Sequence, residues 1–297
     1  MTEDVKPILV CMVWRGGERF ARCLTSIQRA RHHFSRVVIS VTGPIDGADM
    51  IRARQAQEAD ASIEVICTGI ELPTMKHQDF WVTYLQTTQA QPEEWIYWLA
   101  YDDEVRLSGL DAITQAGSWP LQEGTAYFGP WALRHESPTK LWDGDPTADL
   151  ESWTSFPTDG PTELPVATWI TQQLAQPTYM QMSGSVNPFQ AFITLKEQRP
   201  RKRGPMRIEM AIAAQPCTRT VAEFAEPISI IYGRSDSDRA SYGRAARWED
   251  LHLLGLLAKR GYINRGELKH YLTFFPRNLS TLGRASEEWR VRGHVSP

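Results

Sequence analysis

The sequence predicts an α/β protein with a doubly wound, mostly parallel sheet flanked by helices. Short apolar runs rich in β-branched residues alternate with segments of helical spacing, which is the order of strand–helix–strand units. The first run, residues 8–13, is apolar throughout, as a strand buried on both faces would be. Glycine or charged residues follow these runs, at the positions where open α/β sheets bind ligands.

The strands predicted in the first half are residues 8–13, 36–41, 63–67 and 95–100. Helical patterns separate them: Phe20, Leu24 and Ile27 lie at i, i+4 and i+7, and residues 75–88 show similar spacing. Parallel strands end at the same edge of a sheet, so we expect the loops at 14–17, 42–47 and 101–104 to share one rim.

The pattern loosens after about residue 130. Residues 142–165 are rich in Pro, Asp, Gly and Thr and predict a long loop. A helix is expected at 208–214, a strand at 228–232, and helical structure from 244 onward.

The composition is that of an ordinary globular protein. The chain has 297 residues, 42% hydrophobic and 23% charged, and a formal net charge of -3 that argues against a nucleic-acid partner. Its four cysteines form no CxxC pair, and no apolar run is long enough to span a bilayer. We therefore expect a cytoplasmic protein.

An acidic cluster, Asp102-Asp103-Glu104, directly follows the fourth predicted strand. Three successive carboxylates repel one another, and a hard divalent ion with oxygen ligands would offset that repulsion while keeping positions open for substrate phosphates. The alternative is an acidic N-cap for a helix at 105–116. The residues alone leave both interpretations open.

The order and spacing of these segments resemble glycosyltransferase family 2, whose members have the GT-A fold. The resemblance covers roughly residues 7–241, and the segments that carry it are 8–17, 38–47, 95–104, 204–213 and 228–241. It implies a GT-A-like catalytic domain at 1–241, with a nucleotide-binding half at 1–130 and an acceptor-side half at 131–241. Residues 242–297 would then form a helical C-terminal extension.

The resemblance also implies roles for individual residues. Asp103 is the first choice as metal ligand, Asp102 the second and Glu104 the third. Glu209 is the expected general base. The residues expected to contact the nucleotide-sugar are Val13, Trp14, Arg15, Asp46, Lys76, Asp102, Arg207 and Arg234.

Three residues depart from the family pattern. Val41 and Thr42 stand where the family usually has an acidic residue that reads the base, which leaves Asp46 as the candidate for that role. Tyr101 occupies a position of the metal motif that is often Asp.

The implied reaction is transfer of a sugar from a nucleoside-diphosphate donor to a hydroxyl of a glycan or lipid-linked glycan. It would depend on Mg²⁺ or Mn²⁺, and inversion is implied only by the resemblance. Two other functions stay open. One is a sugar-phosphate nucleotidyltransferase, for which residues 14–17 are only a faint version of the required Gly-rich loop. The other is a non-catalytic sugar-binding homologue, which the departures from the family pattern allow.

Each candidate residue also has a structural interpretation. Glu209 would then be an exposed helix residue paired with Arg207 or Arg203. Lys76 and His77 would be a surface pair at a helix start. The basic residues within 199–203 either close over a diphosphate or form a solvated turn. Tryptophans in or beside the loose middle region could stack on sugars, although most tryptophans are packed in cores; they are Trp131, Trp142, Trp153 and Trp169.

Residues 242–297 carry ten basic and five acidic side chains next to an apolar stretch around Tyr271 to Phe275. Such a segment can lie on an anionic membrane surface as a peripheral contact. Packing on the catalytic domain or in a homo-oligomer is the commoner fate of an apolar face.

Overall fold

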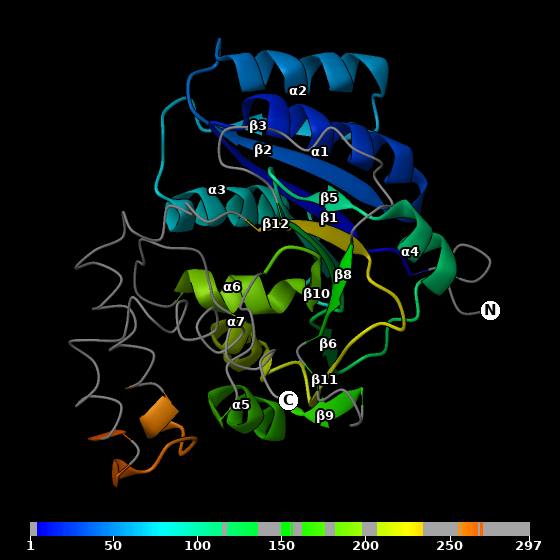
Figure 1. Cartoon of the computed structure of the whole chain (residues 1–297). Coiled ribbons are helices and arrows are strands. Elements are labelled where there is room, and N and C mark those ends of the chain that lie inside the picture. The colour runs from blue at the N-terminus through cyan, green and yellow to red at the C-terminus, as the bar shows by residue number, and fades with distance from the viewer. Residues whose placement is uncertain are drawn as a thin grey trace.

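The computed structural model describes residues 5–114, 118–135, 150–154, 156, 162–175, 182–197, 207–233, 255, 257–266 and 268–269. Their strands form an eight-stranded sheet of order β3-β2-β1-β4-β10-β6-β11-β9 and a four-stranded sheet of order β5-β12-β7-β8 (Figure 1).

The first half of the chain is a regular alternation of strands and helices. Its elements are β1 (Ile8–Trp14), α1 (Gly17–Ala30), the 3₁₀ helix η1 (Arg31–His33), β2 (Arg36–Thr42), α2 (Ala48–Ala59), β3 (Ile63–Cys67), α3 (Thr74–Thr87) and β4 (Trp95–Ala100). β1 pairs in parallel with both β2 and β4, and β2 pairs in parallel with β3. The four strands predicted from the sequence are confirmed.

The strand β1 is buried on both faces, as its apolar run predicts. Leu9, Cys11 and Val13 belong to the core that α1, α2 and α4 (Leu107–Ile113) cover. Ile8, Val10 and Met12 belong to a second core, covered by the helices α3, α5, α6 and α7. In Figure 1, α1 and α2 lie above β1 and α6 lies below it.

The second half is less regular and makes the sheet mixed. Its remaining elements are β5 (Glu104–Val105), β6 (Thr125–Tyr127), β7 (Trp131–His135), β8 (Glu151–Trp153), β9 (Glu163–Pro165), α5 (Val166–Ala175), β10 (Ser185–Pro188), α6 (Phe189–Glu197), α7 (Arg207–Ala214), β11 (Thr220–Ala222) and β12 (Ser229–Gly233). β10 runs antiparallel to β4, so the doubly wound parallel part ends there.

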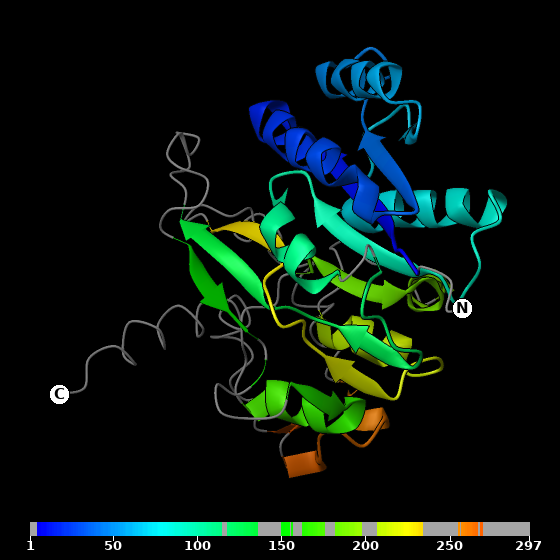
Figure 2. The same ribbon diagram turned by 90° about the vertical axis from the view of Figure 1, so that its right-hand side faces the viewer.

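The prediction of a long loop at 142–165 is wrong in its described part, because β8 and β9 lie there. β8 joins the smaller sheet through β7, and β9 joins the larger one through β11. Figure 2 shows the smaller sheet from the side, with β7 and β8 in green and β12 in yellow.

The described part of the C-terminal segment packs against the protein. Leu257 and Ile263 are buried in the core that contains α7, and Leu268 lies against it. The Gln215 side-chain amide hydrogen-bonds the Tyr262 hydroxyl. Packing is therefore the role of residues 257–268 that the structure describes; the apolar stretch beyond residue 269 lies outside the described residues. No described helix combines the length and the apolar character that a membrane span requires.

Candidate functional site at the carboxyl edge of the sheet

The loops after β1, β2 and β4 share one edge of the sheet, as predicted. The Asp49 carboxylate, at the start of α2, accepts hydrogen bonds from the backbone N–H groups of Gly16 (2.7 Å) and Gly17 (2.9 Å). These bonds join the loop after β1 to the loop after β2. The Tyr101 N–H donates to the Met12 carbonyl at 3.2 Å, which joins β4 to β1 at the same edge.

Arg15 is held in the first loop by a partner that the sequence did not reveal. Its Nε and Nη2 donate to the two oxygens of Glu71, both at 2.9 Å, and Arg15 itself has a φ of 49°. Both side chains are well exposed, and the bond from Arg15 lowers the pKa of Glu71. Its guanidinium also lies 5.4 Å from the ring centroid of the exposed Trp14. The rim therefore presents a cation and an indole to solvent.

Val41 and Thr42 stand where the resembled family usually has an acidic residue, and Thr42 holds the loop that carries Glu71. Its Oγ1 donates to the Ile70 carbonyl at 3.2 Å and accepts from the Leu72 N–H at 2.7 Å. Thr42 is buried, whereas Asp46 is exposed on the loop after β2. Of these two side chains, Asp46 is the one that a ligand can reach.

Lys76 and His77 differ in their surroundings. Lys76 is exposed and lies 3.7 Å from Asp79. His77 is buried, and its Nε2 is 2.8 Å from the Ser40 Oγ, so the interpretation of His77 as a surface residue is wrong. Burial lowers the pKa of His77 to about 4. The imidazole is therefore neutral at physiological pH. Its contact with Ser40 links α3 to β2.

The three carboxylates of the acidic cluster differ in burial and in their hydrogen-bond partners. Asp102 is half-buried. Asp103 is 1% exposed, and its Oδ1 accepts a hydrogen bond from the Tyr232 N–H at 3.0 Å. Glu104 lies 3.1 Å from the Arg22 Nε and accepts a hydrogen bond from the Tyr232 hydroxyl. Among the described residues, these three do not form a group whose ligand atoms converge as those of a metal site would.

Arg22, from α1, provides positive charge that offsets the repulsion within the cluster. Besides its ion pair with Glu104, its Nη2 donates to the Asp102 carbonyl at 3.1 Å. Its guanidinium carbon lies 3.5 Å from the centroid of the Tyr232 ring. Burial and the neighbouring Glu104 raise the pKa of Tyr232, which keeps its hydroxyl protonated.

The N-cap interpretation of the acidic cluster is wrong. α4 begins at Leu107, its N-cap residue is Arg106, and no side chain caps it. Glu104 instead belongs to β5, which pairs with β12. The acidic residues therefore join the end of β4 to β12, which lies in the segment 228–241 of the family resemblance.

The end of β4 is also held by the turn at 183–185. The Ser183 hydroxyl accepts from the Ala100 N–H at 3.0 Å, and the Gly184 N–H donates to the Trp98 carbonyl at 2.7 Å. Gly184 has a φ of 74°, and a Cβ there would lie 2.0 Å from the Ser229 Oγ. Only glycine fits this close approach of the turn to β12.

The tryptophans that the structure describes in this region are core residues. Trp131 is 2% exposed and donates to the Ser183 carbonyl, and Trp169 is fully buried against Phe128. Nothing is described of the Trp153 side chain, and Trp142 lies outside the described residues. Sugar stacking by Trp131 or Trp169 is therefore excluded in this structure.

The acceptor-side candidates are only partly described. Arg207 and Glu209 lie in the first turn of α7, whose next five residues, 210–214, are buried. The side chains of Arg207 and Glu209, the basic residues at 199–203 and the whole of Arg234 lie outside the described part. Val13, by contrast, is 0% exposed near the end of β1, so the expected contact of Val13 with the nucleotide-sugar is not available in this structure.

Comparison with solved structures gives the fold a name. The S. aureus TarS 1–349 structure in complex with UDP-GlcNAc superposes with a TM-score of 0.53 at 10% identity, over 91% of this chain and 71% of that one. The chain has a GT-A-like fold.

Two further structures are similar at lower scores. GalNAc-T7 with UDP, GalNAc and Mn²⁺ has a TM-score of 0.48 at 10% identity, over 99% of this chain and 58% of that one. For 4-diphosphocytidyl-2C-methyl-D-erythritol synthase the TM-score is 0.30 at 17% identity, over 50% and 72%. No family model and no curated protein matches the sequence.

Proposed function

We propose that this protein is a glycosyltransferase that moves a sugar from a nucleoside-diphosphate donor to a hydroxyl of a glycan or lipid-linked glycan. The observation that carries the proposal is that the loop after β1, with Trp14 and Arg15, and the loop after β4, with Asp102, lie at the same carboxyl edge of a GT-A-like sheet. Ligands of open α/β sheets bind at this edge. In this proposal residues 1–130 bind the donor and 131–241 the acceptor.

The rim residues suit the parts of a nucleotide. The exposed indole of Trp14 offers a flat face to a base, and the guanidinium of Arg15 suits a diphosphate. Asp46 is the exposed carboxylate for base recognition, and Lys76 is a second cation near the start of α3. Because the TarS structure holds UDP-GlcNAc, a uridine nucleotide is the first donor to test.

A divalent ion, Mg²⁺ or Mn²⁺, fits Asp102 and Asp103 better than it fits Glu104. Such ions are held by one or two carboxylates together with substrate phosphates. Glu104 is already paired with Arg22, and one oxygen of Asp103 is bonded to Tyr232, which leaves Asp102 as the more accessible carboxylate. When bound, the ion would neutralise charge on the departing diphosphate.

The protein's own residues then bind and orient the reactants. Arg22 fixes the backbone of Asp102, and Asp103 holds β12 against the strand end. Glu209, in the first turn of α7, would take the proton from the acceptor hydroxyl as that oxygen attacks the anomeric carbon, with inversion there.

A thermal-shift panel tests this function. In Mn²⁺, UDP and UDP-sugars at 100 times their dissociation constant should raise the free energy of unfolding of the wild type by about 2.7 kcal/mol. In EDTA the same ligands should stabilise it far less. Asp102→Asn should lose the metal-dependent part. Glu58→Gln, which removes an exposed carboxylate from α2, is the matched control and should respond like the wild type.

The enzymatic outcome separates this function from its rivals. Release of sugar from the donor in the presence of Mn²⁺ supports a transferase. Pyrophosphate formed from a nucleoside triphosphate and a sugar phosphate would show a nucleotidyltransferase instead. Donor binding without turnover would indicate a sugar-binding homologue.

A further inference from the structure

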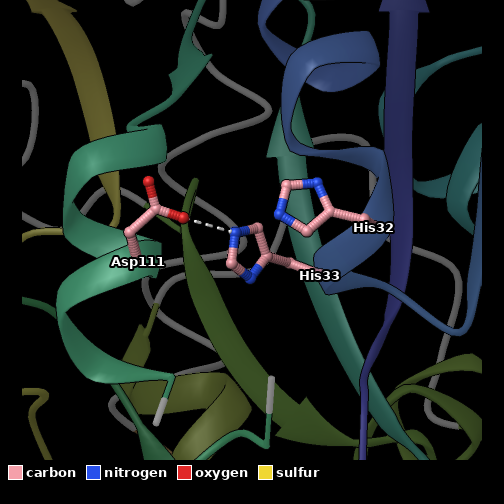
Figure 3. A group of neighbouring side chains, drawn as sticks. All are labelled: His32, His33 and Asp111. Carbon is pink, nitrogen blue, oxygen red and sulfur yellow. Dashed lines mark hydrogen bonds and ion pairs between the residues drawn. The ribbon is translucent and has the colours of Figure 1, made fainter. Parts of the chain in front are cut away.

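A second cluster of ligating side chains lies far from the rim. His32 and His33 form the 3₁₀ helix η1, which follows α1 and precedes β2, so they lie at the amino end of the strands. Asp111 reaches them from α4 (Figure 3). The candidate donor site occupies the opposite, carboxyl edge of the same sheet, so the two sites are separate.

The three side chains present ligand atoms to one another. One ligand atom from each lies within 4.8 Å of the other two, and no other such group of three occurs among the residues that the structure describes. The His33 Nε2 is 2.9 Å from the Asp111 Oδ1, and the two imidazole centroids are 4.0 Å apart. Figure 3 shows a ring nitrogen of His32 on the side that faces His33.

The surroundings of His33 orient its ring toward such a role. The Thr114 hydroxyl donates to the Leu110 carbonyl at 2.7 Å and lies 3.3 Å from the His33 Nδ1. When the His33 Nε2 carries a proton, it donates that proton to the Asp111 carboxylate. A metal ion would replace this proton, and the ring would then keep its remaining proton on Nδ1, which faces the Thr114 oxygen. Histidines that bind metals are oriented by the same kind of bond from the other ring nitrogen.

We propose that His32, His33 and Asp111 bind a divalent transition-metal ion, with Zn²⁺ as the best match. Two imidazoles and one carboxylate are a known zinc ligand set, and three protein ligands leave a coordination position open. Asp111 is exposed and can move by the few tenths of an ångström that separate its 2.9 Å contact from the ligand spacing around zinc.

The ion would add a connection between η1 and α4, which already meet through the contact of His33 with Asp111. The Trp119 Nε1–H donates a hydrogen bond to the His33 carbonyl at 2.7 Å, and the Lys6 Nζ donates to the His32 carbonyl at 3.0 Å. These bonds fix the backbone of η1, so the ligands are held in place before an ion arrives. Binding of the ion would then hold η1 against α4, beside the core that α1, α2 and α4 cover.

Titration calorimetry of the full chain with Zn²⁺ tests the proposal. One ion should bind per chain, and His32→Gln and Asp111→Asn should each raise the Kd at least about 100-fold. Both side chains are exposed, so both variants should fold, whereas a change at the buried His33 would confuse binding with stability. Glu58→Gln should bind Zn²⁺ like the wild type.

Two further results decide the proposal. His32→Gln and Asp111→Asn should keep the wild-type response to UDP with Mn²⁺, because the donor site lies at the other edge of the sheet. A Zn²⁺ affinity unchanged in the double variant would overturn the proposal and leave a His33–Asp111 ion pair only. Zn²⁺ binding that is lost in Asp102→Asn but kept in His32→Gln would overturn it equally.

Discussion

The backbone N–H of Tyr232 donates to the Asp103 carboxylate across 129 positions of sequence. This bond closes a unit in which Arg22 contacts Glu104 on one side and the Tyr232 ring on the other. The acidic end of β4 is thus held between α1 and β12, and Asp103 has a structural role in addition to the ligand role predicted for it.

That structural role predicts different results for two substitutions of Asp103. Asp103→Ala removes the acceptor of the buried Tyr232 N–H and should lower the free energy of unfolding by about 1–3 kcal/mol. Asp103→Asn keeps an acceptor oxygen and should cost clearly less, while still losing the metal-dependent UDP response. Urea denaturation measures the first effect, and equal stability of the two variants would contradict this account.

The ion pair between Arg15 and Glu71 predicts competition with the donor. Arg15→Gln should weaken UDP binding about tenfold, the scale of one charge-assisted hydrogen bond. Glu71→Gln frees the guanidinium and should leave UDP binding unchanged or strengthen it. Calorimetric titration with UDP checks both variants. If Arg15→Gln binds UDP like the wild type, the Arg15 guanidinium only holds the loop through its ion pair with Glu71.

The buried His77 predicts a loss of stability in acid. The unfolded chain binds a proton near the ordinary pKa of 6.5, whereas the folded protein does so only near pH 4. Stability should therefore fall as the pH drops through this interval, by about 3 kcal/mol in total.

His77→Gln isolates that effect, because every other titrating group stays the same. The free energy of unfolding, measured by urea at pH 7.5 and at pH 4.5, should fall less between these two pH values in the variant than in the wild type. Parallel pH dependences would show that His77 titrates normally. Gln can still bond the Ser40 hydroxyl, which favours folding of the variant.

Glu209 is predicted to act in catalysis and not in donor binding. Glu209→Gln should bind UDP-sugar nearly as tightly as the wild type and transfer sugar at least about 100-fold more slowly, the usual scale for loss of a general base. Single-turnover transfer assays measure this. An unchanged rate would assign the proton transfer to another group.

One hypothesis for the basic C-terminal segment is contact with anionic membranes, and the other is packing or homo-oligomer formation. Leu257 and Ile263 belong to the core, so a truncation that spares them, removing residues 270–297, is the suitable variant. The wild type should co-sediment with anionic vesicles at low salt and be released at high salt, and the truncated chain should bind less. Absence of vesicle binding at low salt would leave packing or homo-oligomer formation as the segment's role.

The regular half of the fold could be predicted from the sequence because its signals are local. β1 to β4 lie in continuous apolar runs, which burial on both faces of a parallel sheet requires. The shared rim could also be predicted, because parallel strands end at the same edge of a sheet. The short strands β8 and β9 were missed because three residues leave too little pattern to recognise.

The GT-A-like architecture, the edge of the sheet that carries the candidate site and the acidic residues there could all be inferred from the sequence. Their partners depend on the folded structure: Glu71 for Arg15, Asp49 for the first loop, and Arg22 with Tyr232 for Asp103 and Glu104. It also buried His77 and brought Asp111 to His33. Hydrogen bonds and ion pairs between residues tens of positions apart leave no periodic trace in a sequence, because they depend on how separate elements pack.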